Sequence, residues 1–209
     1  MWRFGAARAN AMKMPMNVMA PSEPIANDEP RPFKLRIEDY ELLDRAGAFQ
    51  GLRVELIGGR VVVVNARFQA HGLVKNRLGR RLQSALEAMG SDLETVIEGS
   101  LALSANDLPD PDILVGAVTP VRDYIRVDQV ALVIEVADTS IRHDLGEKRD
   151  LYAIGKVPEY WVVDVNTAVV HRFWEPQEGV YRAEPPIPLA GELRSLTMPE
   201  LTIDGAGML

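Results

Sequence analysis

The sequence predicts an α/β or α+β fold with one mixed central β-sheet flanked by helices. Two short, nearly continuous apolar runs, at residues 111–115 and 130–137, are typical of strands covered on both faces. Hairpin patterns at residues 52–64 and 159–174 bracket these runs and add antiparallel strands. A long stretch at residues 70–89 has apolar side chains at helical spacing. Strands bracketed by helices, with hairpins at both ends, indicate a mixed sheet.

Length, charge and cysteine content exclude several classes of protein. The chain has 209 residues, a net charge of −7 and no cysteine. The length suits one domain with a tail, and the missing cysteines exclude a disulfide framework, a thiolate zinc site and a thiol nucleophile. The acidic balance argues against a protein that coats nucleic acid non-specifically, because such binding depends on an excess of Lys and Arg. It allows a local basic groove, and it can reflect carboxylates gathered around a metal.

Residues 1–32 differ from the rest of the chain. They contain five of the eight methionines and five of the fourteen prolines, without a periodic apolar pattern. We expect a disordered N-terminal tail, followed by one domain over residues 33–209, on which the net charge is −8. No apolar run has the form of a signal peptide or approaches the ~20 residues of a membrane span. We therefore expect a cytoplasmic protein without a membrane anchor.

The first predicted elements follow from turns and caps. Residues 37–46 have apolar side chains at helical spacing, and Gly47 ends this helix. The hairpin at residues 52–64 turns at Gly58 and Gly59. The long helix at residues 70–89 ends at a capping glycine and has one apolar stripe at i, i+4 spacing, made of Val74, Leu78, Leu82 and Leu86.

The second half of the chain is richer in strands. Residues 95–103 predict a strand ahead of the two apolar strands. Residues 159–165 and 168–174 predict a hairpin with an Asn-Thr turn. After Gly179 the sequence predicts only short strands and proline-rich turns.

A second helix is predicted at residues 144–154. Asp144 and Glu147 have the spacing of a capping box at its start. Lys148 lies one turn beyond Asp144 on the same helix face. Two interpretations of Lys148 stay open: a solvated helix lysine, which the spacing alone favours, or a cation that points back toward the preceding strand. In the second case its ammonium can stabilise a phosphate or orient an attacking water.

Three carboxylates interrupt apolar strands: Glu55, Asp112 and Glu135. A buried charge must be paired, neutralised or bound to a metal, because bare burial is costly. Each residue taken alone can be a strand-end or edge residue that faces water. If the three converge, their charges repel, and a hard divalent cation removes that repulsion. The residues therefore predict a site for Mg²⁺, or for Mn²⁺ in its place, held by carboxylates and water.

Four segments, in order and with fitting spacing, resemble the Uma2 family (DUF820), a group of restriction endonucleases within the PD-(D/E)XK nuclease-like superfamily. They are PDILV (111–115), LVIEVADTS (132–140), DLGEKRDLY (144–152) and VPEYWVVDV (157–165). Upstream segments and the closing LRSLTMPELTI also fit, so the resemblance covers roughly residues 33–204. It implies a restriction-endonuclease-like fold, Mg²⁺-dependent cleavage of DNA and assembly as a homodimer.

The resemblance also implies roles for individual residues. Asp112 matches the metal ligand of the Pro-Asp motif, Glu135 matches the acidic ligand of the (D/E)XK motif, and Glu55 matches an acidic residue of the early strand. The sequence departs from the superfamily at Ala137, where the motif lysine would stand. The Uma2 family carries a lysine on the next helix instead, matched by Lys148. The implied catalytic residues are Glu135, Lys148 and Asp112, with Glu55, Asp112 and Glu135 as metal ligands.

Other polar residues allow more than one interpretation. His71 begins the long helix, where it can donate to a phosphate or a carboxylate, and it joins Asp144 as a possible accessory residue. His143 and His171 are predicted to lie on the surface. The basic side chains of the long helix can contact DNA phosphates, although a solvated helix face is the simpler interpretation. These side chains are Lys75, Arg77, Arg80 and Arg81.

The leading hypothesis is a Mg²⁺-dependent endonuclease acting on DNA. The alternative is a catalytically inactive protein of nuclease fold with a DNA-binding or regulatory role, which Ala137 and the acidic charge favour. A third hypothesis is a metal-dependent hydrolase acting on RNA or nucleotides. The chain lacks the HExxH, GxxxxGK[ST], GxGxxG and GxSxG motifs, so zinc-protease, ATPase, dinucleotide-binding and α/β-hydrolase activities have no support.

Overall fold

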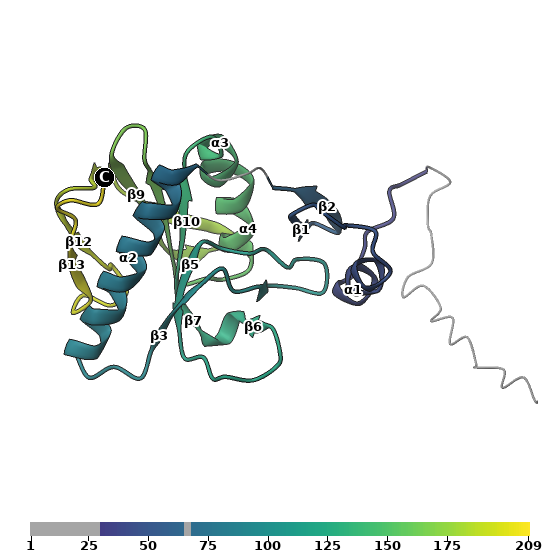
Figure 1. The fold of residues 1–209 in the computed structure, drawn as a ribbon, viewed down its shortest axis with the longest axis horizontal. Helices are drawn as coiled ribbons and strands as arrows, with labels where there is room; N and C mark the ends of the chain where they lie inside the picture. Colours follow the sequence, from purple (N-terminus) through teal and green to yellow (C-terminus); the bar gives the residue numbers. More distant parts are fainter. Residues whose placement is uncertain (1–29, 65–67) are drawn as a thin grey trace, which may run out of the picture. The chain divides into compact units, whose positions relative to one another are not determined.

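The computed structural model describes residues 30–64 and 68–209 (Figure 1). By its internal contacts the chain divides into two units, residues 1–32 and 33–209. The predicted disordered tail falls almost entirely outside the described residues. The second unit contains every helix and strand discussed below. None of the helices in the described ranges is both long and apolar enough to cross a membrane.

A seven-stranded mixed sheet forms the centre of the second unit, as the sequence predicts. The strand order is β10-β9-β8-β7-β5-β3, with β11 paired to β9. Strands β7 and β8 run parallel, whereas the other pairs are antiparallel. The strands are β3 (Glu94–Ile97), β5 (Ile113–Gly116), β7 (Val130–Ala137), β8 (Glu159–Asp164), β9 (Val169–Gln177), β10 (Val180–Ala183) and β11 (Ile187–Pro188).

Helices cover both faces of this sheet, because alternate side chains of a strand point to opposite faces. Helix α2 (Gln69–Ala88) crosses one face, where its predicted apolar stripe packs on Leu132, Ile134 and Val136 of β7 (Figure 1). The other face of β7 presents Val133 and Ala137 to the short helices that connect β7 to β8. These are α3 (Ile141–His143), the π-helical turn η2 (Asp144–Lys148) and α4 (Arg149–Ile154).

Smaller elements surround the central sheet. Helix α1 (Ile37–Arg45) precedes the predicted hairpin of β1 (Val54–Ile57) and β2 (Arg60–Val63). Gly58 and Gly59 form its turn with φ values of 58° and 74°, which glycine adopts without strain. The remaining elements are β4 (Leu101–Ala102), β6 (Ile125–Arg126), the 3₁₀ turn η1 (Val127–Gln129), β12 (Glu192–Arg194) and β13 (Thr202–Asp204).

Two predicted elements have different bounds in the structure. The single strand predicted at residues 95–103 is wrong: Glu98, with φ at 59°, breaks it into β3 and β4. The helix predicted at residues 144–154 begins earlier, at Ile141. Asp144 therefore lies inside the helical segment, and the interpretation of Asp144 and Glu147 as a capping box is wrong. The sequence pattern shows neither the positive φ nor the π-helical turn, because both depend on tertiary contacts.

A buried carboxylate, Glu159 on β8, ties the C-terminal segment to the sheet. Glu159 has no exposed surface. It accepts hydrogen bonds from the Trp161 indole at 2.6 Å and the Ser195 hydroxyl at 2.6 Å. The main-chain amides of Leu196 and Thr197, each at 2.9 Å, and the Thr197 hydroxyl at 2.7 Å complete the set. These donors stabilise the buried negative charge, because hydrogen bonds to a charged acceptor are the strong ones.

We expect Glu159→Gln to lower the free energy of unfolding by about 3 kcal/mol, because an amide nitrogen then faces donors that bind a charged acceptor. Urea denaturation of both proteins measures the difference. Glu192→Gln, at an exposed position on β12, is the control and should stay within about 0.5 kcal/mol of the wild type. Equal stability of Glu159→Gln and wild type would contradict this role.

Candidate active site

The three predicted strand carboxylates meet at one cavity of about 260 Å³. Glu55 comes from β1, Asp112 directly precedes β5, and Glu135 lies on β7. Ile113 pairs with Ile134, so the same register places Asp112 opposite Glu135 on one face of the sheet. The three residues are only 1–3% exposed. Asp112 does lie at a strand end, but the interpretation that these residues face water is wrong, since all three are buried.

Lys148 provides the positive charge among these carboxylates. Its Nζ lies 2.8 Å from Glu135 Oε1 and 3.1 Å from Glu55 Oε1. Its side chain is 4% exposed. The interpretation of Lys148 as a solvated helix lysine is therefore wrong. Although Ala137 replaces the superfamily lysine on β7, a lysine from the following helix contacts the same glutamate.

The π-helical turn η2 positions Asp144 and Lys148 on the same side, so that both line the cavity. Asp144 is 3% exposed and accepts a hydrogen bond from the Ser140 hydroxyl at 2.6 Å. The Tyr160 hydroxyl donates to the main-chain carbonyl of Asp144 at 3.0 Å. Single π-helical turns inside α-helices occur frequently at functional sites. Here the turn brings two buried charged side chains to the carboxylates of the sheet.

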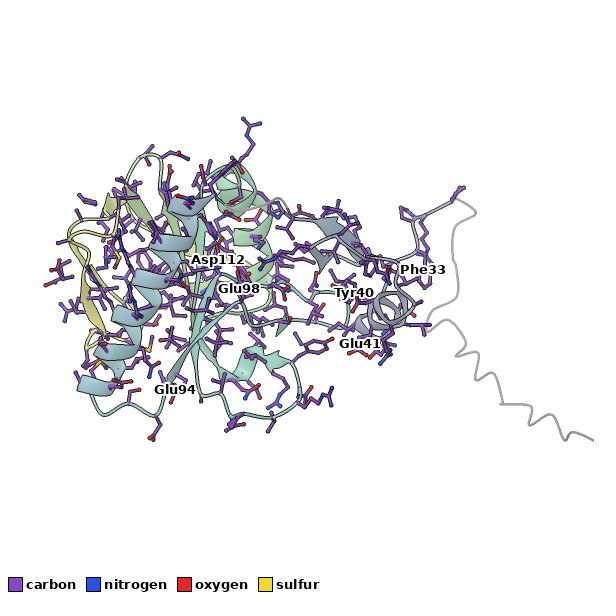
Figure 2. The ribbon with its side chains drawn as sticks, in the orientation of Figure 1. Phe33, Tyr40, Glu41, Glu94, Glu98 and Asp112 are labelled. Carbon is purple, nitrogen blue, oxygen red and sulfur yellow. The ribbon has the colours of Figure 1, made fainter. Side chains whose placement is uncertain are left out.

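Asp112 is in contact with three other parts of the chain, namely β7, α2 and the segment between β3 and β4. Its Oδ2 accepts from the amide of Val136 at 2.9 Å, and its Oδ1 lies 3.2 Å from Nε2 of His71. His71, 4% exposed, reaches it from the first turn of α2. The main-chain carbonyl of Asp112 accepts from the amide of Glu98 at 3.2 Å, and the two residues lie close together in Figure 2. The predicted accessory residue His71 therefore lies beside a carboxylate of the site.

All six residues predicted for the site line this one cavity: Glu55, His71, Asp112, Glu135, Asp144 and Lys148. His143 also lines it, although we predicted a surface position; its imidazole lies 3.5 Å from Glu147 and its side chain is 32% exposed. His171 is half-buried on β9 and is not among the lining residues. The remaining wall contains five apolar residues and three polar residues, namely Val62, Val63, Val64, Phe68 and Val136 with Asp138, Thr139 and Ser140.

Sequence reasoning missed the lining residues Asp138, Thr139 and Ser140, and it also missed one donor to Glu135, the side chain of Tyr152. Its hydroxyl donates to Glu135 Oε1 at 2.9 Å from α4, and its side chain is fully buried. Tyr152 lies four residues after Lys148, so helical spacing places both on one face. That spacing could have indicated that Tyr152 lies near the site. A tyrosine in an apolar helix pattern, however, is usually a core residue.

Burial and charge crowding shift the pKa values at the site. Burial raises the pKa of Glu135 to about 8; Lys148 opposes this shift, and the charges of Asp112, Asp144 and Glu55 add to it. Burial also raises the pKa of Asp144. Burial alone would lower the pKa of Lys148, but Glu135, Glu55 and Asp144 outweigh it and raise that pKa. The ammonium thus stays charged at neutral pH, while Glu135 and Asp144 hold a proton more readily than ordinary carboxyl groups do.

The donor set fits a small metal site. Within residues 30–64 and 68–209, no three His, Asp or Glu side chains are grouped as ligands of one ion. Mg²⁺ keeps several waters and is usually held by one or two carboxylates, so a full protein cage is not required. Asp112 and Glu135 provide such a pair; burial raises the pKa of Glu135, and the charges of Asp112, Asp144 and Glu55 add to that shift. Glu55 and Glu135 both accept hydrogen bonds from Lys148, so this contact does not separate them, and Glu55 stays a predicted third ligand.

The basic side chains of α2 mostly stabilise the fold. Lys75 is buried and forms an ion pair with Glu98, so its interpretation as part of a solvated face is wrong. Arg77 donates to the carbonyl of Met208 at 3.0 Å, and Arg81 donates to the carbonyl of Ala206 at 2.7 Å. Arg80 is exposed. Of these four side chains, Arg80 is therefore the one best placed to contact a phosphate.

Comparison with known proteins confirms the resemblance found in the sequence. Residues 37–205 match the model of the Uma2 family, which is described as "Putative restriction endonuclease". A crystal structure of "a putative nuclease belonging to DUF820" from Anabaena variabilis ATCC 29413 matches with a TM-score of 0.62. The two chains share 13% identity, over 83% of this chain and 97% of that chain, so this likeness carries the fold alone. No curated protein matches the sequence.

The raised pKa of Glu135 predicts how stability changes with pH in metal-free buffer. The folded chain keeps the Glu135 proton up to a pKa of about 8, whereas the ordinary pKa is 4.5. Between these values the folded state binds more protons, so this residue's contribution to the free energy of unfolding decreases as pH rises from about 5 to about 8.

Urea denaturation of wild type and Glu135→Gln across this range tests the prediction. The stability of the wild type relative to the variant should decrease with rising pH, because glutamine has no proton to lose. His171, whose pKa is lowered by burial, acts in the opposite direction and is common to both proteins. Parallel pH profiles would contradict the shift.

Proposed function

Because the chain belongs to the Uma2 family, we propose that it is a Mg²⁺-dependent endonuclease that hydrolyses phosphodiester bonds of DNA. One observation carries the proposal: Asp112, Glu135 and Lys148 come from three separate elements to one cavity. Buried carboxylates and a buried ammonium in one water-accessible cavity are costly to fold, and they are typical of sites with a chemical role.

Two carboxylates would hold the ion. Asp112 and Glu135 lie opposite one another across β5 and β7; the amide of Val136 donates to Asp112, and His71 lies beside it. Bound Mg²⁺ lowers the pKa of a coordinated water and offsets the charge that develops on a phosphate. The protein's own contribution is to fix both carboxylates in a buried position, so that little reorganisation precedes binding.

Lys148 would supply the second positive charge. Glu55 and Glu135 hold its ammonium, and the raised pKa of Lys148 keeps it protonated across the physiological range. A fixed ammonium beside a phosphate stabilises negative charge that builds up during hydrolysis. Glu55 then also acts by positioning Lys148.

We expect the protein to contact only a few phosphates of its substrate, close to the cavity. The domain is acidic, and Lys75, Arg77 and Arg81 are engaged within the fold. Few phosphate contacts mean weak binding that falls further with salt. We further propose a homodimer, because two sites related by a two-fold axis can cut both strands of a duplex. Light scattering of the purified protein tests that assembly.

Plasmid cleavage in the presence of Mg²⁺ or Mn²⁺ tests the function. We expect Glu135→Gln and Lys148→Met each to reduce the cleavage rate by about 100-fold or more, because each removes a group that would act on the phosphate or its metal. Asp150→Asn is the matched control, since Asp150 is an exposed acidic residue on the same helical segment and should leave the rate unchanged.

The outcomes separate the hypotheses. Unchanged cleavage by Glu135→Gln would overturn the assignment of this site. Binding of Mn²⁺ without cleavage of DNA would favour the alternative, a nuclease-fold protein with a binding or regulatory role, which Ala137 and the acidic charge support. Cleavage of RNA in preference to DNA would favour a ribonuclease acting through the same residues.

A further inference from the structure

Two donors converge on a single oxygen of Glu135. The ammonium of Lys148 lies 2.8 Å from Oε1, and the hydroxyl of Tyr152 lies 2.9 Å from the same atom. Lys148 is in η2 and Tyr152 follows in α4, so one continuous helical segment presents both donors. The hydrogen bonds that Glu135 accepts from side chains in the described ranges thus all end on Oε1, which distinguishes the two oxygens of the carboxylate.

We propose that Tyr152 is a positioning residue, whose hydroxyl fixes Glu135 so that Oε2 is the oxygen offered to the divalent cation. This inference rests on the proposed function, because it concerns the same carboxylate. A carboxylate held at one oxygen loses its rotational freedom about the last side-chain bond. The entropy cost of fixing it is then met on folding rather than on ion binding.

The surroundings of Tyr152 favour this role over simple core packing. A buried hydroxyl is costly unless it donates to a partner, so a phenylalanine would be the simpler core residue here. Burial raises the pKa of Tyr152 well above 10, which keeps the hydroxyl a donor at all physiological pH values. The Tyr152 ring packs on Tyr160 with a centroid separation of 4.9 Å. Tyr160 in turn donates to the main-chain carbonyl of Asp144, so each hydroxyl binds a residue that lines the cavity.

A second buried tyrosine of the same apolar cluster provides a matched control. Tyr181 is 9% exposed, and its ring centroid lies 6.4 Å from that of Tyr160. Its hydroxyl donates to the main-chain carbonyl of Val157 at 2.8 Å rather than to a carboxylate. Tyr181→Phe and Tyr152→Phe therefore remove the same atom from the same cluster, and only Tyr152→Phe changes a contact of Glu135.

Calorimetric titration of the full chain with Mn²⁺ tests the proposal. We expect Tyr152→Phe to weaken Mn²⁺ binding by about 10- to 100-fold, the usual effect of removing a hydrogen bond to a metal ligand. Tyr181→Phe should bind Mn²⁺ as the wild type does. The Mn²⁺-dependent rise in the urea midpoint gives a second readout, which remains usable if Tyr152→Phe is less stable.

Equal Mn²⁺ affinities of Tyr152→Phe and wild type would overturn the role of Tyr152 and leave the metal-dependent function intact. Equal weakening by both tyrosine variants would also overturn it, since the effect would then follow from the cluster as a whole. A wild type that binds no Mn²⁺ would overturn the metal-dependent function and, with it, the role of Tyr152.

Discussion

The site depends on the contact of the Lys148 ammonium with Glu55 and Glu135. Four buried carboxylates around one cavity would repel each other strongly in a low dielectric. Lys148 compensates part of that charge, while burial, with the charges of Asp112, Asp144 and Glu55 added to it, raises the pKa of Glu135. The remaining negative charge is what makes the cavity suitable for a divalent cation. The fold therefore carries an electrostatic cost that only a bound ion or a proton offsets.

The architecture brings these groups together through two local devices. The register between β5 and β7 places Asp112 opposite Glu135, and the parallel connection from β7 to β8 requires a helical crossover above that point. The π-helical turn in the crossover presents Asp144 and Lys148 on one side. Helix α2 completes the site from the opposite face of the sheet with His71. The functional groups thus come from several segments that are far apart in the sequence, and Asp144 and Lys148 share one of them.

Much of this arrangement was predictable from the sequence, and for a physical reason. A charge inside an apolar strand conflicts with burial, so Glu135 and Asp112 identified the site before its geometry was known. The role of Lys148 was ambiguous, because helical spacing gives the same pattern for a solvated and a buried lysine. The contacts of Tyr152 and Lys75 could not be predicted for related reasons. A tyrosine in an apolar pattern has the spacing of a core residue, and a lysine on a helix has the spacing of a surface residue. In each case the carboxylate that the side chain binds lies elsewhere in the sequence, so the local pattern does not show the contact.

The position of a bound ion tests this account most directly. A crystal structure of the protein soaked with Mn²⁺, with anomalous scattering recorded at the manganese edge, locates the metal without reference to activity. The account predicts one anomalous peak in contact with the carboxylates of Asp112 and Glu135, with Glu55 still bound to Lys148. Full occupancy of Mn²⁺ elsewhere, or none at these two carboxylates at millimolar Mn²⁺, would contradict it.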